Sequence, residues 1–235
     1  MFFEKVFNIL NVYHMFRIKR FIKKLNIEYF IDVGAHKGEF LGSILTLRFK
    51  KIYCFEPQRS IFKKLHENFK EKKKVKLFNI GLANKSSKLT IYINKFSSTS
   101  TFSKSKNTTF LRFKNFILNS KNSYIDKYQV KTKKLDEIFI QKKISNIFLK
   151  IDVEGFELNV LKGAKKILSK KVKYILVEKH FFQLFKNNSS NKVHLFLKKN
   201  NFQLIKKFTF PLFHFQDNLY FKIKTNNHSK LTRYK

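Results

Sequence analysis

The stretch NIFLKIDVEGFELNVLKGA, residues 146–164, decides how the rest of the sequence is interpreted. It begins as an apolar run, becomes acidic at Asp152 and Glu154, passes Gly155, and continues from Glu157 with helical spacing. An apolar run that ends in polar residues and a glycine predicts a buried strand, a turn and a helix. The whole chain has 15 acidic residues, and three of them fall here, so this strand end is a candidate reaction site.

Similar strand-like runs lie on both sides of this stretch, with helical patterns between them. Strands are predicted over residues 29–34, 51–57, 75–84, 146–152 and 172–180, with a final pair over 202–208 and 219–224. Helices are predicted over residues 40–49, 60–72, 157–169 and 191–200. Strands that alternate with helices form parallel sheets, and the final pair has no helix between its strands. We therefore predict an α/β fold: a Rossmann-like, doubly wound, mostly parallel seven-stranded sheet with a C-terminal antiparallel hairpin.

Three segments fall outside this regular pattern. Residues 1–28 are expected to form an N-terminal helical extension to a domain over residues 29–224, and residues 225–235 a basic tail. A polar insertion is expected over about residues 85–130, where a short strand, SKLTIYIN, precedes the Ser- and Thr-rich segment SSTSTFSKSKNTT. Long polar insertions in compact domains are usually either mobile or functional.

The N-terminal segment has helical spacing of apolar residues and a basic cluster that begins at Arg17. It lacks the order of charge, apolar core and small residues that a signal peptide has. No window has the roughly 20 consecutive apolar residues of a transmembrane helix. Two interpretations stay open: a helix that packs on the domain, and a helix that lies on a membrane surface. The apolar positions are Phe3, Val6, Phe7, Leu10, Tyr13, Phe16 and Phe21.

The composition is strongly basic, with 51 Lys and Arg residues against 15 acidic ones and a net charge of +36. Such a charge suits nucleic acid or an anionic membrane. The lysines are spread over the whole chain, however, and Lys, Asn, Ile and Phe are all abundant. This pattern favours the composition bias of an AT-rich genome as the explanation of the charge. The lone Cys54 lies in an apolar run, which predicts a buried thiol and excludes an internal disulfide.

The ends of the first three predicted strands carry residues suited to a nucleotide-like ligand. Asp32, Gly34 and Gly38 lie between the first strand and its helix, where glycines allow a close approach of the backbone. The loop lacks the middle glycine of a dinucleotide fingerprint, and its acid would repel a pyrophosphate but would suit a cationic cofactor. Glu56 ends the second strand, where a carboxylate accepts both hydrogen bonds of a ribose diol. Together with the segment Gly81–Leu82, which offers a surface for a base, these residues predict S-adenosylmethionine, whose sulfonium is positive.

The sequence resembles the FkbM family of S-adenosylmethionine-dependent methyltransferases in five motifs over about residues 29–180: FIDVGAHKGEF, IYCFEP, NIGLAN, LKIDVEGFELNVLKGA and ILVEKH. The fourth motif is the most specific, and the family often has Asn where this chain has His36. The resemblance implies a class I methyltransferase that acts mainly on hydroxyl oxygens, commonly of sugars or polyketide-type products. It implies that the methionine part lies beside Asp32, Gly34, Ala35 and Gly38, the ribose beside Glu56 and Pro57, and the adenine beside Gly81 and Leu82.

Methyl transfer to a hydroxyl requires alignment of the acceptor oxygen and removal of its proton. Asp152 is our first candidate for the base or for the group that orients the acceptor. Glu154 joins it if the chain stays extended, and His180, at the end of the fifth parallel strand, is a second candidate base. The alternative for the acids is a structural ion-pair network with Lys150, while Glu157 is expected to begin a helix.

Two acids and a histidine also form a ligand set for a divalent ion, so a metal stays open as a cofactor. Glu178 alternates with His180 and is expected to support it as a neighbouring partner. These interpretations predict a cytoplasmic methyltransferase that acts on a hydroxyl of a sugar, glycan or related small metabolite.

Two other functions stay open, both suggested by the basic charge. One is ribose 2′-O methylation of nucleic acid, and the other is a non-catalytic module that binds a membrane surface or nucleic acid. Methylation of base amino groups is disfavoured, because the usual Pro-Pro loop is absent: the only prolines are Pro57 and Pro211.

Overall fold

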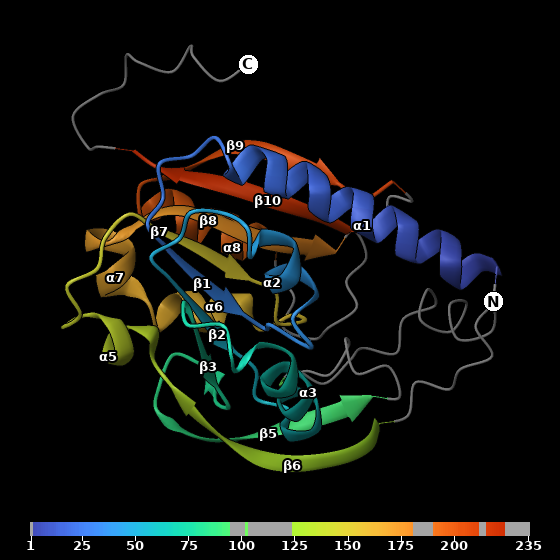
Figure 1. The fold of residues 1–235 in the computed structure, drawn as a ribbon. Helices are drawn as coiled ribbons and strands as arrows, with labels where there is room; N and C mark the ends of the chain where they lie inside the picture. Colours follow the sequence, from blue (N-terminus) through green and yellow to red (C-terminus); the bar gives the residue numbers. More distant parts are fainter. Residues whose placement is uncertain (1, 95–101, 103–123, 181–189, 212–214, 224–235) are drawn as a thin grey trace.

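The computed structural model describes residues 2–94, 102, 124–180, 190–211 and 215–223. At its centre lies a seven-stranded sheet with the strand order β3–β2–β1–β7–β8–β10–β9 (Figure 1). The first five strands in this order are parallel, and β10 pairs antiparallel with both β8 and β9. The strands are β1 (Tyr29–Val33), β2 (Lys51–Phe55), β3 (Val75–Phe78), β7 (Ile147–Ile151), β8 (Val172–His180), β9 (Phe202–Thr209) and β10 (Phe215–Lys222). The predicted sheet, including its antiparallel C-terminal pair, is confirmed.

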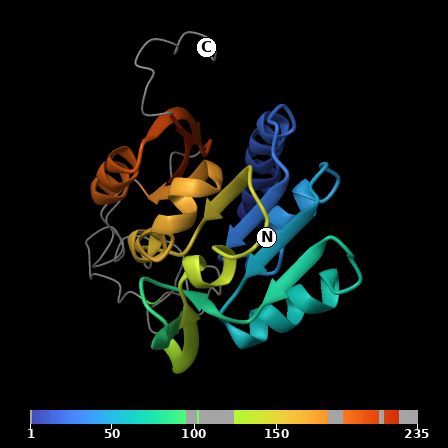
Figure 2. The same ribbon diagram turned by 90° about the vertical axis from the view of Figure 1, so that its left-hand side faces the viewer.

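Helices cover both faces of this sheet (Figures 1 and 2). One hydrophobic cluster joins the sheet to α1 (Phe2–Ile22), α2 (Glu39–Ile44) and α3 (Arg59–Phe69). A second cluster joins the other face to α5 (Leu135–Phe139), α6 (Glu157–Lys162), α7 (Lys165–Lys170) and α8 (Ser190–Lys199). Because both faces are buried, the central strands are apolar at almost every position, as in other parallel sheets.

Side-chain alternation sorts the strand residues between the two faces. In β1, Phe30 belongs to the cluster under α1 and α2, whereas Ile31 and Val33 belong to the cluster under α5 to α8. Asp32 and Lys150 alternate along their strands with residues of the second cluster, so their side chains lie on the face of the sheet that α1 covers.

A small second sheet is built from the region of the predicted polar insertion. It has the order β4–β6–β5, with β4 (Gly81–Leu82), β5 (Ser87–Asn94) and β6 (Tyr124–Lys133). The predicted strand SKLTIYIN is confirmed as β5, whereas β6 was not predicted. The third strand was predicted within residues 75–84, with its end near Gly81; instead β3 ends at Phe78, and Gly81–Leu82 forms the separate strand β4, which pairs with β6. Of the Ser- and Thr-rich segment, residues other than Phe102 lie outside the described part of the chain, as does the predicted tail.

The predicted helix over residues 157–169 is divided into α6 and α7. Gly163 ends α6, and a Cβ at this position would lie 2.0 Å from the backbone oxygen of Ala83. The helix stops there because its backbone packs directly against the NIGLAN segment. In the described part of the chain, no helix is both long enough and apolar enough to cross a membrane.

Candidate active site at the carboxyl edge of the sheet

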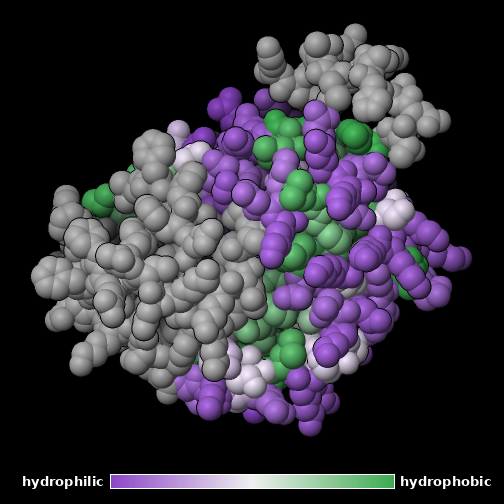
Figure 3. All heavy atoms as spheres, turned by 180° about the vertical axis from the view of Figure 1, so that it is seen from behind, coloured by the Kyte–Doolittle hydropathy of each residue, from purple (hydrophilic) through white to green (hydrophobic). Residues whose placement is uncertain are grey.

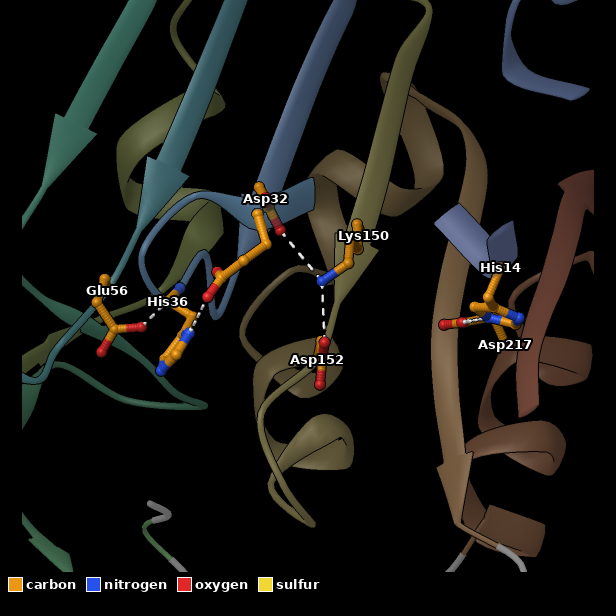
Figure 4. Close-up of polar contacts among 8 residues, drawn as sticks. His14, Asp32, His36, Glu56, Lys150, Asp152 and Asp217 are labelled. Atoms are coloured by element: carbon orange, nitrogen blue, oxygen red, sulfur yellow. Dashed lines mark hydrogen bonds and ion pairs between the residues drawn. The ribbon is translucent and has the colours of Figure 1, made fainter. Parts of the chain in front are cut away.

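Charged side chains from four neighbouring strands form one row at the carboxyl edge of the sheet. Asp32 of β1 lies opposite Lys150 of β7, and Glu178 of β8 lies opposite Asp217 of β10. Because β7 and β8 are parallel and in register, Asp152, the first residue after β7, comes beside Glu178. We call these five residues the polar row; Figure 4 shows four of them.

The Lys150 ammonium lies between two carboxylates of the polar row (Figure 4). Its Nζ is 3.4 Å from Oδ1 of Asp32 and donates a 3.1 Å hydrogen bond to Oδ2 of Asp152. Burial opposes its charge, but the attraction of Asp152, Asp32 and Asp217 is larger and raises the pKa of Lys150 above its usual value. Lys150 therefore stays protonated and holds the Asp152 carboxylate at the carboxyl end of β7.

Asp32 is fully buried below the loop that leaves β1. Its contact with Lys150 is an ion pair without hydrogen-bond alignment, so neither carboxylate oxygen has a hydrogen-bond partner among the described residues. Burial raises the pKa of Asp32, while the Lys150 charge opposes this shift. A buried carboxylate without donors is costly, which makes Asp32 a candidate acceptor for donors that arrive with a ligand.

Glu154 and Glu178 complete a cluster of three carboxylates with Asp152, in which one oxygen of each lies within 4.8 Å of the others. Glu154 has a φ of 51° and Gly155 a φ of 90°, so a turn, rather than strand alternation, brings Glu154 here. Burial, and then the charge and hydrogen bond of Asp152, raise the pKa of Glu178 well above its usual value. Among the described residues, this is the group that could hold a metal ion, and its oxygen ligands would suit Mg²⁺ or Ca²⁺.

Glu56 directly follows β2 and holds the loop between β1 and α2. Its Oε2 accepts a 3.0 Å hydrogen bond from the His36 backbone N–H, and its Oε1 accepts a 2.8 Å bond from that of Gln58 (Figure 4). Burial raises the pKa of Glu56 to about 7, against the opposite effect of these two hydrogen bonds. A carboxylate offers about four acceptor positions, so about two remain for the hydroxyl groups of a ligand.

The loop after β1 depends on left-handed backbone conformations. Gly34 has a φ of 83° and Gly38 a φ of 93°. A Cβ on Gly34 would lie 1.8 Å from the backbone oxygen of Asp152, so only glycine lets this loop pack against the end of β7. His36 also has a positive φ, 51°, and its Nδ1 lies 2.9 Å from Oε1 of Glu39. Asn and His are both enriched at such angles, which explains why His replaces the Asn of the family pattern.

The other predicted cofactor residues lie around the same edge. Ala35 and Leu82 are buried, and Pro57 follows Glu56. Gly81 faces the ring of Phe102, because a Cβ at this glycine would be 2.7 Å from the Phe102 Cζ. Sequence reasoning missed Phe102, because it follows Leu82 by 20 positions and lies beyond β5 in the Ser- and Thr-rich segment.

Two further predicted residues have different outcomes. Glu157 begins α6, and its Oε1 accepts a 2.8 Å hydrogen bond from the Gly155 N–H, so its prediction as a helix-start residue is confirmed. His180 ends β8 opposite Phe215, but its side chain lies outside the described part of the chain.

A buried pair that the sequence did not predict extends the polar row to α1. The Nε2 of His14 lies 2.7 Å from Oδ2 of Asp217, and the rings of Phe210 and Phe215 pack against the imidazole at 5.7 and 5.3 Å. The two partners are 203 positions apart in the sequence, so no local pattern joins them. The N-terminal helix is thereby attached to the edge of the sheet that carries the acids (Figure 4).

Comparison with known proteins adds a family to this geometry. Residues 32–204 match the family described as "Methyltransferase FkbM domain". A methyltransferase FkbM from Methylobacillus flagellatus has a similar structure, with 16% identity and a TM-score of 0.53 over 83% of this chain. This chain spans 43% of the length of that protein.

Two more solved structures share the fold. A S-adenosylmethionine-dependent methyltransferase from Leishmania major has 11% identity and a TM-score of 0.51, over 91% of this chain and 73% of its own. Fibrillarin from Aeropyrum pernix, in complex with S-adenosyl-L-methionine, has 9% identity and a TM-score of 0.50, over 88% and 76%. No curated protein matches the sequence. The family match covers most of the chain, including four of the five residues of the polar row, and the chain therefore belongs to the FkbM family of S-adenosylmethionine-dependent methyltransferases.

Proposed function

We propose that this methyltransferase transfers a methyl group to a hydroxyl oxygen of a sugar, glycan or related small metabolite. The observation that carries the proposal is the convergence of Asp152, Glu154 and Glu178 at the end of β7 and β8, beside the glycine loop. A hydroxyl is a weak nucleophile, and carboxylates at hydrogen-bond distance can orient it and accept its proton. We place the reaction in the cytoplasm, because the single cysteine is a free, buried thiol, as reducing compartments favour.

The residues at the ends of β1 and β2 fit S-adenosylmethionine as the methyl donor. When bound, this cofactor supplies a methyl group on a positively charged sulfur. Glu56 has acceptor positions left for a ribose diol, and the unsatisfied Asp32 carboxylate gives this edge a buried negative charge. Gly34, Ala35 and Gly38 provide the adjoining backbone, while Pro57, Gly81 and Leu82 border the proposed ribose and adenine positions.

Within this arrangement, Asp152 is the proposed contact of the acceptor hydroxyl. Its side chain is 35% exposed, whereas Lys150 and Asp32 beneath it are almost fully buried, so it is the member of this ion-pair chain that a substrate can reach. Lys150 holds one carboxylate oxygen of Asp152 in place, and the proposed contact with the hydroxyl forms at this carboxylate. Glu154 and Glu178 lie next to Asp152 and are proposed to hold the acceptor and the released proton, and His180 stays a proposed alternative base.

Calorimetric titration with S-adenosylmethionine and its demethylated product tests the cofactor part. We expect binding to be lost in Glu56→Ala and kept in Glu67→Ala, since Glu67 is an exposed carboxylate on α3. Equal binding by both variants would remove Glu56 from the cofactor site.

Transfer of an isotopically labelled methyl group to sugar and glycan acceptors tests the reaction. Asp152→Asn should lower kcat by about 100-fold or more, with little change in cofactor affinity, as for loss of an acid–base group. Mass spectrometry should find the label as a methyl ether; a label on nitrogen or carbon would contradict the proposal.

A further inference from the structure

The outward side of α1 carries hydrophobic side chains that no other described element covers. Ile9, Val12, Tyr13 and Phe16 are 68%, 62%, 54% and 53% exposed. Their spacing of three, four and seven positions places them on one side of the helix, and we call them the outward face of α1. Single exposed hydrophobic residues need no explanation, but a contiguous group usually marks an interaction site.

The opposite side of the same helix is firmly packed against the sheet. The helix therefore has a separate core-facing side, and the outward face is not that side. Ile18 and Ile22 are 2% and 3% exposed and belong to the hydrophobic cluster above the sheet. His14 is held by Asp217, and Nη1 of Arg17 donates a 3.0 Å hydrogen bond to the backbone oxygen of Thr209. The fold therefore fixes which side chains α1 presents outward.

Basic residues continue the outward face toward the end of the helix. Arg20 and Lys23 follow Phe16 at four and seven positions, on the same side, and both are exposed; Lys24, also exposed, comes next to them. Helices that bind at a bilayer interface combine apolar side chains, which contact the acyl chains, with Lys and Arg side chains, which attract anionic lipid headgroups. The outward side of α1 has both kinds of side chain next to each other.

We propose that the outward face of α1 binds an anionic lipid bilayer, with the helix parallel to the membrane plane. The net charge of +36 complements such a surface. Nucleic acid would also attract the cations, but it gives no reason for four apolar side chains beside them. His14 of the same helix contacts Asp217, so this docking would place that end of the polar row beneath the membrane-bound helix. The inference does not depend on the identity of the methyl acceptor.

Vesicle flotation tests the proposal with the full chain. We expect it to float with phosphatidylcholine vesicles that contain about 30% phosphatidylglycerol and to stay unbound with phosphatidylcholine alone, at about 0.1 M salt. The double variant Ile9→Ser/Phe16→Ser should lower the partition coefficient at least about tenfold, because it removes two large apolar side chains from the interface. Arg20→Gln and Lys23→Gln should each lower it about fivefold.

A matched control is Leu195→Ser on α8, which removes a side chain that is 55% exposed on the other side of the sheet. This variant should float like the unmodified protein, and circular dichroism should show that all variants are folded. Equal binding to neutral vesicles, or unchanged binding by the Ile9→Ser/Phe16→Ser variant, would overturn the proposal. The absence of vesicle binding would also overturn it. If light scattering then shows a dimer that the Ile9→Ser/Phe16→Ser variant abolishes, the outward face binds a second copy of the chain.

Discussion

At the scale of single residues, two features of the surroundings of Glu56 shift its pKa in opposite directions. It accepts two backbone hydrogen bonds, which favour the charged form, while its burial favours the neutral form and raises its pKa to about 7. The group that orders the proposed cofactor loop therefore titrates near neutral pH.

Glu56→Gln tests the effect of this buried charge on stability. The folded protein keeps the Glu56 proton up to about pH 7, whereas an unperturbed glutamate releases it near the reference pKa of 4.5. The folded state thus binds more protons between these values, and the free energy of unfolding decreases as the pH rises through this window. We expect up to about 3 kcal/mol of this decrease to be absent in Glu56→Gln. Urea unfolding at about pH 5 and 8 measures it, with Glu67→Gln as the control; an unchanged pH slope in Glu56→Gln would refute the shift.

Gly34→Ala is the sharpest test of the backbone contact between the two strand ends. The new Cβ would lie 1.8 Å from the Asp152 backbone oxygen, at a φ of 83°. We expect a loss of at least about 2 kcal/mol in the free energy of unfolding. The control is Gly42→Ala within α2, where the nearest atom is 3.8 Å away, and it should be neutral or stabilising by up to about 1 kcal/mol. Similar losses in thermal unfolding for both variants would contradict this account.

At the scale of elements, α1 is attached to the sheet through a buried polar pair as well as through apolar packing. His14→Ala would leave Asp217 buried without its partner, and we expect a destabilisation of about 3 kcal/mol. Val12→Ala, on the exposed side of the same helix, should stay within about 0.5 kcal/mol of the unmodified protein.

Adding Asp217→Asn to His14→Ala should recover part of the lost stability, because it removes the uncompensated charge. Chemical denaturation of the single and double variants decides this. If the second substitution only adds to the loss, the two side chains act independently and the pair is not what anchors α1.

The sequence predicted the main sheet because its central strands are apolar runs that end in acids and glycines, a pattern set by local chemistry. It did not predict β6, whose buried positions Val130 and Thr132 alternate with lysines and whose partner β5 lies some 30 residues earlier. Nor did it predict the break between α6 and α7, because the helical spacing continues across Gly163. That break comes from a contact with Ala83, which only the folded chain reveals.

The candidate site shows the same division. Asp152 and Glu56 were predicted because each lies at the end of a predicted strand. Glu178 was expected only as a support for His180, and its place in the carboxylate cluster results from the pairing of β7 with β8. The tie from Asp217 to α1 joins distant parts of the chain, for which one sequence carries no signal.

At the scale of the whole molecule, the positive charge is broadly distributed. Hydrophilic side chains surround small hydrophobic areas on the face seen in Figure 3. We expect RNA to bind this surface without sequence preference at about 0.05 M salt and to be released steeply by about 0.2 M. Filter binding across this range measures the loss, and labelled methyl groups should not appear in the RNA. Methylated RNA would instead support the nucleic-acid alternative.

The polar row has a further consequence in such a molecule. It gathers four of the 15 acidic residues around a single cation, so the place where chemistry is proposed has the opposite sign to its surroundings. The basic exterior attracts polyanions over a long range. At short range, the acids of the polar row repel the phosphates of such molecules. Neutral hydroxyl compounds meet no such repulsion at the polar row, even when they reach it from an anionic surface.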